Sequence, residues 1–158
     1  MELDYAMSSE IIFAKGNTMR HRLLVSLVIA NTFLAINNLH AEEIKIGMLY
    51  PITGGGAIYG SPAQIGHRMG VEEINLDGGL LGLQAISVER DTKLNPATAA
   101  AAAKEMITKD GVNVLIGGLS SSVGLAVSEV ARQEKVIYIA TIAKTIQMTT
   151  NKRHNYVF

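Results

Sequence analysis

The sequence predicts an α/β fold in which a parallel sheet carries helices on both faces. Short apolar runs, typical of buried strands, alternate with longer helix-forming stretches along residues 42–158. Turns rich in glycine, or built on asparagine and proline, separate these segments. The resulting order, β-α-β-α-β-α-β, needs crossover connections, which are right-handed in such sheets.

Composition excludes several functional classes. The chain has 158 residues, with 14 basic and 14 acidic side chains that sum to a formal charge of zero. This balance gives no electrostatic basis for binding nucleic acid, and aromatic residues, at 5%, are few for stacking on bases. The absence of cysteine from the sequence excludes disulfides, thiolate metal sites and cysteine nucleophiles.

The N-terminal region has the pattern of an export signal. Basic residues at 20–22 precede an apolar stretch, Leu23–Ile36, and Ala41 offers a small residue for cleavage. The apolar stretch is shorter than the roughly 20 residues that span a bilayer. We therefore expect a signal peptide over residues 19–41 and not a membrane anchor.

The mature protein is expected to begin near Glu42. No cysteine follows the cleavage position, so a lipoprotein is not expected. The expected product is a soluble periplasmic protein without stable membrane insertion. Residues 1–18 are interpreted as an upstream extension, with Met19 as the true start.

The first strand and the first helix are predicted near the start of the mature chain. The run Ile44–Tyr50 is apolar apart from one lysine, as in a buried strand of a parallel sheet. Pro51 ends this run, and a glycine-rich loop follows. Ser61 and Pro62 have the residue types of an N-cap and a first helical position, so the helix is expected from there to about Asn75.

The second strand and helix follow a turn. Asp77–Gly79 ends the first helix, and Leu83–Glu89 alternates enough for a strand. Asn95 and Pro96 repeat the cap pattern, and the alanine-rich stretch after them favours a helix until Gly111.

The remaining elements complete the alternation. Val112–Ile116 is predicted as the third strand, Ser122–Glu134 as the third helix and Val136–Ala140 as the fourth strand. Residues 156–158 resemble the start of a fifth strand, with no helix after it. We therefore expect the chain to be the front part of a longer protein.

The loops lack complete versions of three enzyme motifs. Tyr59 occupies the place of the third glycine of a dinucleotide-binding G-x-G-x-x-G. Gly60–Ser61 lacks the lysine of a P-loop, and Gly118–Ser122 has serine where a nucleophile elbow needs its second glycine. His67 and His154 show neither metal spacing nor an evident carboxylate partner. The sequence favours binding without catalysis, cofactor or metal.

Ligands of open parallel sheets bind at the carboxyl ends of the strands, so the loops after Tyr50, Ile116 and Ala140 are the candidate site. The second loop leads into a helix, whose first N–H groups lack partners and favour an anion. The residues alone leave two interpretations open. The loop captures a small carboxylate, or Ser120 or Ser121 caps its own helix.

Four motifs in sequence order resemble the periplasmic substrate-binding proteins of ABC transporters for branched-chain amino acids. They are the P-x-T-G loop, the I-N-x-x-G-G turn, the D-x-x-x-x-P pair and the G-x-x-S-S loop. The resemblance runs from Ile44 to Phe158. It implies the type I fold of that family, in which two lobes close on a ligand, with residues 42–158 as a truncated first lobe.

The resemblance also implies site residues. Ser121, with the backbone of Leu119 and Ser120, would bind the α-carboxylate of the ligand. Backbone groups of Ile142 and Ala143 would add contacts from the loop after the fourth strand.

Two further positions carry expectations about specificity. Tyr59 would lie at the edge of the cleft. Lys144 departs from the family, which commonly has a small hydroxyl residue in contact with the ligand at this position. A lysine there could hold a second carboxylate or an aromatic acid; alternatively it points to water and Thr145 contacts the ligand.

The function that the resemblance implies is transport. The protein would capture a small amino acid or related carboxylate and deliver it to the membrane permease of an ABC transporter. The alternative is a ligand-binding sensor domain with the same fold. An NAD-dependent enzyme is disfavoured by Tyr59 and by the export signal.

Overall fold

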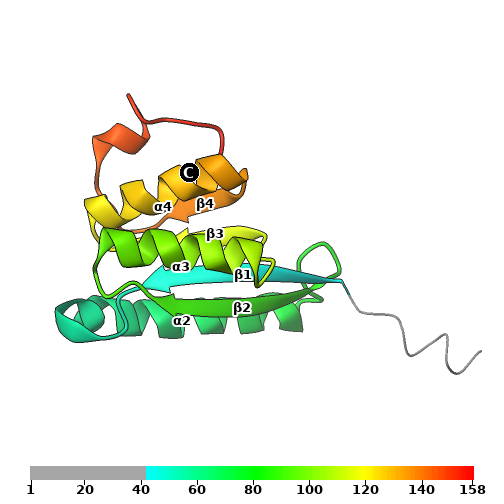
Figure 1. Cartoon of the computed structure of the whole chain (residues 1–158). Coiled ribbons are helices and arrows are strands. Elements are labelled where there is room, and N and C mark those ends of the chain that lie inside the picture. Colours follow the sequence, from blue (N-terminus) through cyan, green and yellow to red (C-terminus); the bar gives the residue numbers. More distant parts are fainter. Residues whose placement is uncertain (1–41) are drawn as a thin grey trace, which may run out of the picture. The chain divides into compact units, whose positions relative to one another are not determined.

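The sheet has four strands that run parallel in the order β2-β1-β3-β4. A computed structural model describes residues 42–158 (Figure 1), and the expected upstream extension and signal peptide, residues 1–18 and 19–41, lie outside the described residues. The strands are β1 (Glu43–Tyr50), β2 (Gln84–Asp91), β3 (Val114–Gly117) and β4 (Ile137–Ala140). They confirm the parallel α/β fold expected from the sequence.

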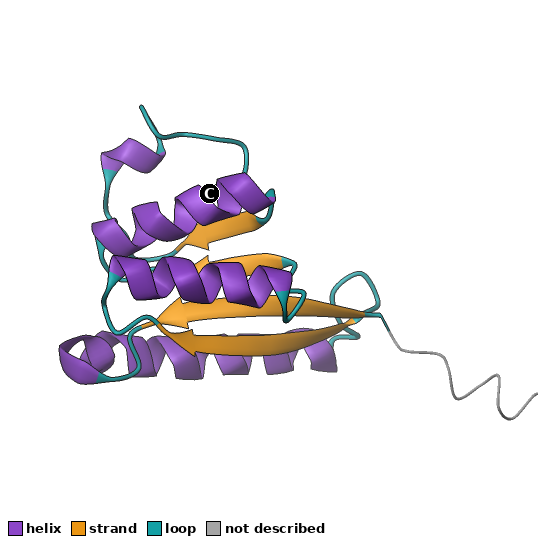
Figure 2. Ribbon diagram, viewed as in Figure 1, coloured by secondary structure: helices purple, strands orange, loops and turns teal. Residues whose placement is uncertain are grey.

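Three α-helices connect the strands, and two short 3-10 helices lie in the loops (Figure 2). The α-helices are α2 (Ala57–Leu76), α3 (Pro96–Thr108) and α4 (Ser121–Glu134), and the 3-10 helices are η1 (Gly54–Gly56) and η2 (Ile146–Met148). The predicted cap of α3 is confirmed, because the Asn95 side chain accepts a hydrogen bond from the Thr98 amide at 2.9 Å.

Side-chain alternation places the helices on opposite faces of the sheet. On β2, Ser87 and Glu89 contact α2, whereas Val88 packs against the core that α3 and α4 cover. Figure 1 shows the same division, with α3 and α4 over one face and α2 along β1 and β2 on the other. Helices on both faces are the expectation for a parallel sheet.

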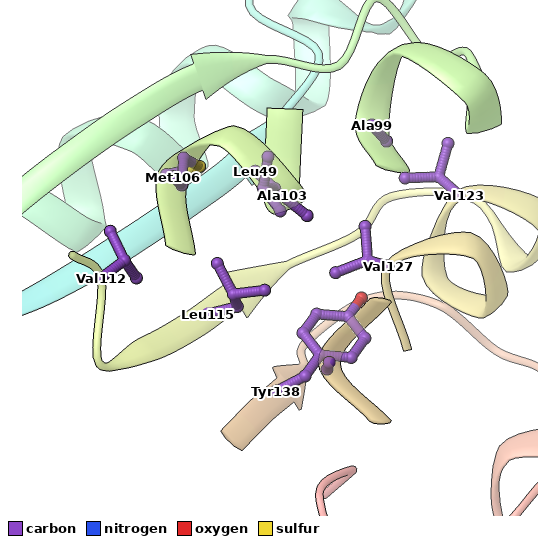
Figure 3. Packing of buried hydrophobic residues seen from close by; sticks show 10 residues of the cluster. Leu49, Ala99, Ala103, Met106, Val112, Leu115, Val123, Val127 and Tyr138 are labelled. Carbon is purple, nitrogen blue, oxygen red and sulfur yellow. The ribbon is translucent and has the colours of Figure 1, made fainter. Parts of the chain in front are cut away.

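The hydrophobic core lies between the sheet and the helices α3 and α4 (Figure 3). Small side chains such as Ala99 and Ala103 let α3 lie close to the sheet, while Leu49 and Leu115 fill the space beneath it. Tyr138 is fully buried beside Val127. This packing fixes the ends of β1, β3 and β4 relative to one another.

The start of α2 differs from the prediction. The helix begins at Ala57, after η1, so Ser61 is not its N-cap and Pro62 lies inside the helix. Tertiary packing overrides the local signal, because Gly60 lies against Pro51: a Cβ at Gly60 would come within 1.8 Å of the Pro51 carbonyl oxygen. Because Pro62 has no N–H, one helical hydrogen bond is missing near the N-terminus of α2.

The last residues pair with β4 through an isolated parallel bridge, at the place where the sequence predicted a further strand. Val157 bridges to Tyr138, and the Ala140 amide donates to the Phe158 carbonyl at 2.8 Å.

In the part of the chain that the structure describes, no helix is long and apolar enough to cross a membrane.

Candidate ligand-binding edge

The carboxyl ends of the parallel strands bring three loops to one edge of the sheet. These loops follow Tyr50, Gly117 and Ala140, and they are the loops that the sequence singled out. Hydrogen bonds join two of these loops to the end of the neighbouring strand. The Gly118 amide donates to the Leu49 carbonyl at 2.9 Å, and the Thr141 amide donates to the Gly117 carbonyl at 3.2 Å.

The Gly117 carbonyl is the centre of this edge. It also accepts a hydrogen bond from the buried Tyr138 hydroxyl at 2.9 Å, and burial raises the pKa of Tyr138. Gly117 and Gly118 have φ angles of 131° and 88°, in the region that favours glycine. A Cβ at Gly118 would lie 2.3 Å from the Tyr138 hydroxyl oxygen. The two glycines therefore let the serine loop lie directly on the sheet.

The serines at the start of α4 have different surroundings. Ser120 is the N-cap, and its hydroxyl oxygen accepts a hydrogen bond from the Val123 amide at 3.3 Å. Its hydroxyl also lies 3.2 Å from that of Ser122. Ser121 is the first residue of the helix and is exposed. Self-capping thus falls to Ser120, and the Ser121 hydroxyl faces solvent at the positive end of the helix.

The loop after β4 lies over the start of α4. A Cβ at Gly124 would come within 2.6 Å of the Ala143 Cβ, so the glycine permits this close contact. Ile142 and Ala143 are partly buried, whereas Lys144 is exposed. The Thr145 side chain accepts a hydrogen bond from the Gln147 amide at 3.3 Å and caps η2, which gives it a structural task of its own.

A small cavity opens beside this loop. Its volume is about 150 Å³, and its lining includes Ala143 and Thr145 together with Val157 and Phe158. Of the site residues expected from the sequence, Ala143 lines this cavity, as does Thr145, the alternative ligand contact. Leu119 is partly buried, and Tyr59, in the first turn of α2, is exposed.

Sequence reasoning missed three side chains at this edge. The Tyr50 and Thr141 hydroxyls contact each other, which links the ends of β1 and β4 across β3. The Asp91 carboxylate accepts a hydrogen bond from the Ile52 amide at 2.9 Å. No local pattern signals such contacts, since each partner is at least 39 positions away in the chain.

A larger cavity, about 360 Å³, lies away from the loops, between the C-terminal half of α2 and β2. Arg68 lines it and pairs with Glu89, with 2.7 Å between Nε of Arg68 and Oε1 of Glu89. The hydrogen bonds from Arg68 hold the pKa of Glu89 at about 2. His67 Nε2 and the Ser87 hydroxyl share a hydrogen bond of 3.0 Å, and burial lowers the pKa of His67.

Among residues 42–158, no cluster of three acidic or histidine side chains could hold a metal.

The match to a protein family identifies the class of protein to which the chain belongs. Residues 43–158 match the sequence profile described as Periplasmic binding protein, and the chain belongs to that family. The fold is that of the type I members, of which the described residues form a part.

Two of the curated proteins that the chain resembles are named for the amino acids that they bind. The leucine-, isoleucine-, valine-, threonine- and alanine-binding protein of Pseudomonas aeruginosa is 32% identical over 136 residues, which cover 86% of this chain and 36% of that protein. The Leu/Ile/Val-binding protein of Escherichia coli K12 is 31% identical and is covered to 32%. The chain spans about a third of the length of the relatives it matches.

Two solved structures with similar folds contain ligands of different kinds, an amino acid and an aromatic acid. The substrate-binding protein LivJ of Streptococcus pneumoniae, in complex with isoleucine, has a TM-score of 0.69 and 31% identity, covering 74% of this chain and 33% of that one. A solute-binding protein of Rhodopseudomonas palustris, in complex with 3,4-dihydroxybenzoic acid, has a TM-score of 0.62 and 28% identity, covering 73% and 31%. Both ligands carry a carboxyl group.

Proposed function

We propose that the chain forms the first lobe of an extracytoplasmic solute-binding protein of an ABC transporter. It would capture a small amino acid or related carboxylate and deliver it to a membrane permease. The family match, together with relatives that bind amino acids, supports this proposal. Residues 19–41, with the pattern of a signal peptide, support a periplasmic location. The sensor alternative has no comparable support among the relatives reported above.

The observation that carries the proposal is that two adjacent serines have different roles at the start of α4. Because Ser120 caps α4, the hydroxyl of Ser121 is available to a ligand at the start of the same helix. The unpartnered N–H groups of the first turn favour a negative charge there. A carboxylate at this point would receive a hydroxyl donor, main-chain donors near Leu119 and the helix dipole together.

The loop after β4 would supply the second group of contacts. Its position over Gly124 brings Ile142 and Ala143 to the edge of the serine loop. Binding needs no covalent step in this arrangement, and closure of a second lobe would bury the ligand and its paired charges.

Lys144 would decide between ligand classes. Its side chain is exposed and carries a positive charge, and it follows Ala143 in the loop proposed to contact the ligand. An amino acid needs one anionic contact, whereas an aromatic acid or dicarboxylate would use the lysine as well. Tyr59 would contribute from the first turn of α2.

A ligand screen with two matched serine variants tests the proposal. In the full-length protein, thermal shifts with L-leucine, L-isoleucine, L-glutamate and 3,4-dihydroxybenzoate should identify a carboxylate that stabilises the fold, with the acidic or aromatic probes preferred if Lys144 contacts the ligand. Ser121→Ala should then weaken binding in calorimetry by roughly 1.5–3 kcal/mol, because a hydrogen bond to a charged group is lost.

Ser120→Ala is the control. Loss of the N-cap should lower the free energy of unfolding by about 1 kcal/mol, and with it the melting temperature. Unchanged affinity in Ser121→Ala would refute the carboxylate role of that serine. A clear preference for leucine or isoleucine would refute the role of Lys144.

A further inference from the structure

Asp91 ties together two loops at the binding edge. It is the last residue of β2, and β2 places it beside Tyr50, the last residue of β1. Its Oδ1 accepts hydrogen bonds from the Ile52 amide at 2.9 Å and the Lys93 amide at 2.8 Å. Its Oδ2 accepts a hydrogen bond from the Thr53 hydroxyl at 2.5 Å. One carboxylate therefore holds the loop after β1 and the loop after β2 at once.

The hydrogen bonds to Asp91 use its charge. Three donors converge on the two carboxylate oxygens, and hydrogen bonds to an ionised acceptor are about twice as strong as neutral ones. Burial opposes ionisation, yet the hydrogen bonds from Thr53 and from the Lys93 and Ile52 amides prevail and lower the pKa of Asp91. The carboxylate is therefore charged and bound at neutral pH.

The loop that Asp91 holds is the one that starts α2. Pro51, next to Ile52, is buried, and its carbonyl lies against Gly60, where a Cβ would come within 1.8 Å. Gly56 also lies against the Pro51 ring. The position of residues 51–53 thus sets the position of the first turn of α2, which carries Tyr59.

We propose that Asp91 is a positioning residue of the ligand-binding edge, which acts through Ile52 and Thr53 to hold the first turn of α2 and Tyr59 in place for the ligand. This inference rests on the proposed function of the edge. A carboxylate bound to three donors has little capacity left to touch an anionic ligand, so Asp91 acts on the ligand only through the loop. A residue that merely capped the turn at Lys93 would leave the loop after β1 unaffected.

The test compares Asp91→Asn with Asp110→Asn in the full-length protein. The asparagine at position 91 keeps the shape and one acceptor oxygen but removes the charge and the acceptor for Thr53. Asp110 is the matched control, because it pairs with Arg90, at 2.7 Å between Nη2 and Oδ2, and makes no contact with the loop after β1 among the hydrogen bonds of the described residues.

The first readout needs no ligand. Hydrogen–deuterium exchange of the peptide covering residues 52–60 should become about tenfold faster in Asp91→Asn, as for the loss of one charge-assisted hydrogen bond. Exchange over residues 117–124 should stay unchanged, and Asp110→Asn should leave residues 52–60 unchanged. Equal exchange in wild type and Asp91→Asn, or faster exchange in both segments, would overturn the proposal.

The second readout is affinity for the probe that gives the largest thermal shift among L-leucine, L-isoleucine, L-glutamate and 3,4-dihydroxybenzoate. Asp91→Asn should weaken it about tenfold, and Thr53→Val combined with Asp91→Asn should weaken it no further, because both changes break one path. Faster local exchange with unchanged affinity would overturn the role in binding. If wild type binds none of the probes, the proposed function fails, and the exchange data still decide whether Asp91 holds the loop.

Discussion

Ser120 and Ser121 are adjacent residues with identical side chains and different roles. The sequence left self-capping and ligand capture open between them, because either hydroxyl could reach the N–H groups of the helix. The start of α4 decides: the extended backbone of Ser120 turns its hydroxyl back to Val123, while Ser121 is already helical and exposed. One residue of helix register separates a structural serine from a candidate ligand contact.

The cap of α3 was predicted from a local signature, whereas residues that act over long distances were not identified. Asn95 was identified as a cap because its partner, Thr98, is three positions away. Asp91 and Tyr50 were not identified as parts of the edge, because their partners Thr53 and Thr141 come near only when the parallel strands pair. Neither the types nor the spacing of these residues carry that information.

Ionisation of the Glu89 carboxyl should make the stability of the fold depend on pH. The pKa of Glu89, about 2, lies below the ordinary value of 4.5, because Arg68, and then Gln64 and Ser87, bind the charged form. A lowered pKa contributes stability that is complete above pH 4.5 and is lost as the pH falls towards 2. Glu89→Gln should therefore lower the free energy of unfolding by about 1 kcal/mol at pH 7, a value reduced by solvent screening of the partly exposed pair.

Urea unfolding of wild type and Glu89→Gln at several pH values measures this contribution. The difference between the two proteins should shrink between pH 4.5 and pH 2. A difference that is constant with pH would mean that the substitution acts through packing and not through the charge.

At the scale of elements, local signals located the helices and strands, and packing decided their ends. Ser61 and Pro62 have the residue types of a helix start, yet α2 begins earlier, at Ala57. The contact of Gly56 and Gly60 with Pro51 stabilises the additional turn. The short strand β3 ends at Gly117, where a Cβ would lie 2.3 Å from the carbonyl oxygen of Leu49 in β1.

Gly117→Ala should destabilise the protein by about 2 kcal/mol or more. The residue has a φ of 131°, and the new Cβ would lie 2.3 Å from the Leu49 carbonyl oxygen, an atom of the backbone that cannot move aside freely. Chemical denaturation measures the change. Gly55→Ala, where a Cβ meets no atom within 4 Å, is the control and should leave stability nearly unchanged. Equal stability of the two variants would contradict the close approach of β1 and β3.

At the scale of the molecule, the two faces of the sheet are covered unequally in residues 42–158. The helices α3 and α4 cover one face, whereas α2 contacts β1 and β2 on the other. The Ile137 and Ile139 side chains of β4 lie on this second face, since Tyr138 between them points into the core, and they are 43% and 39% exposed. Exposed neighbouring apolar side chains favour self-association.

The double variant Ile137→Thr and Ile139→Thr should reduce self-association of this 158-residue chain. Threonine keeps the preference for strand while removing apolar surface. Light scattering as a function of concentration measures the effect. Ile146→Thr, which removes a 74% exposed isoleucine from η2, is the control and should change scattering less. An equal effect of both would show that the sheet face has no special role.

The sequence by itself determined the class of fold, the order of its elements and the three loops that could bind a ligand. These follow from local periodicity, caps and turn residues, and from the rule that parallel strands share a carboxyl edge. Only the tertiary structure decided which serine caps α4, where α2 begins and which side chains join the loops. Those outcomes depend on strand pairing between residues far apart in the chain, and on close approaches that only glycine permits, such as that of Gly60 to the Pro51 carbonyl.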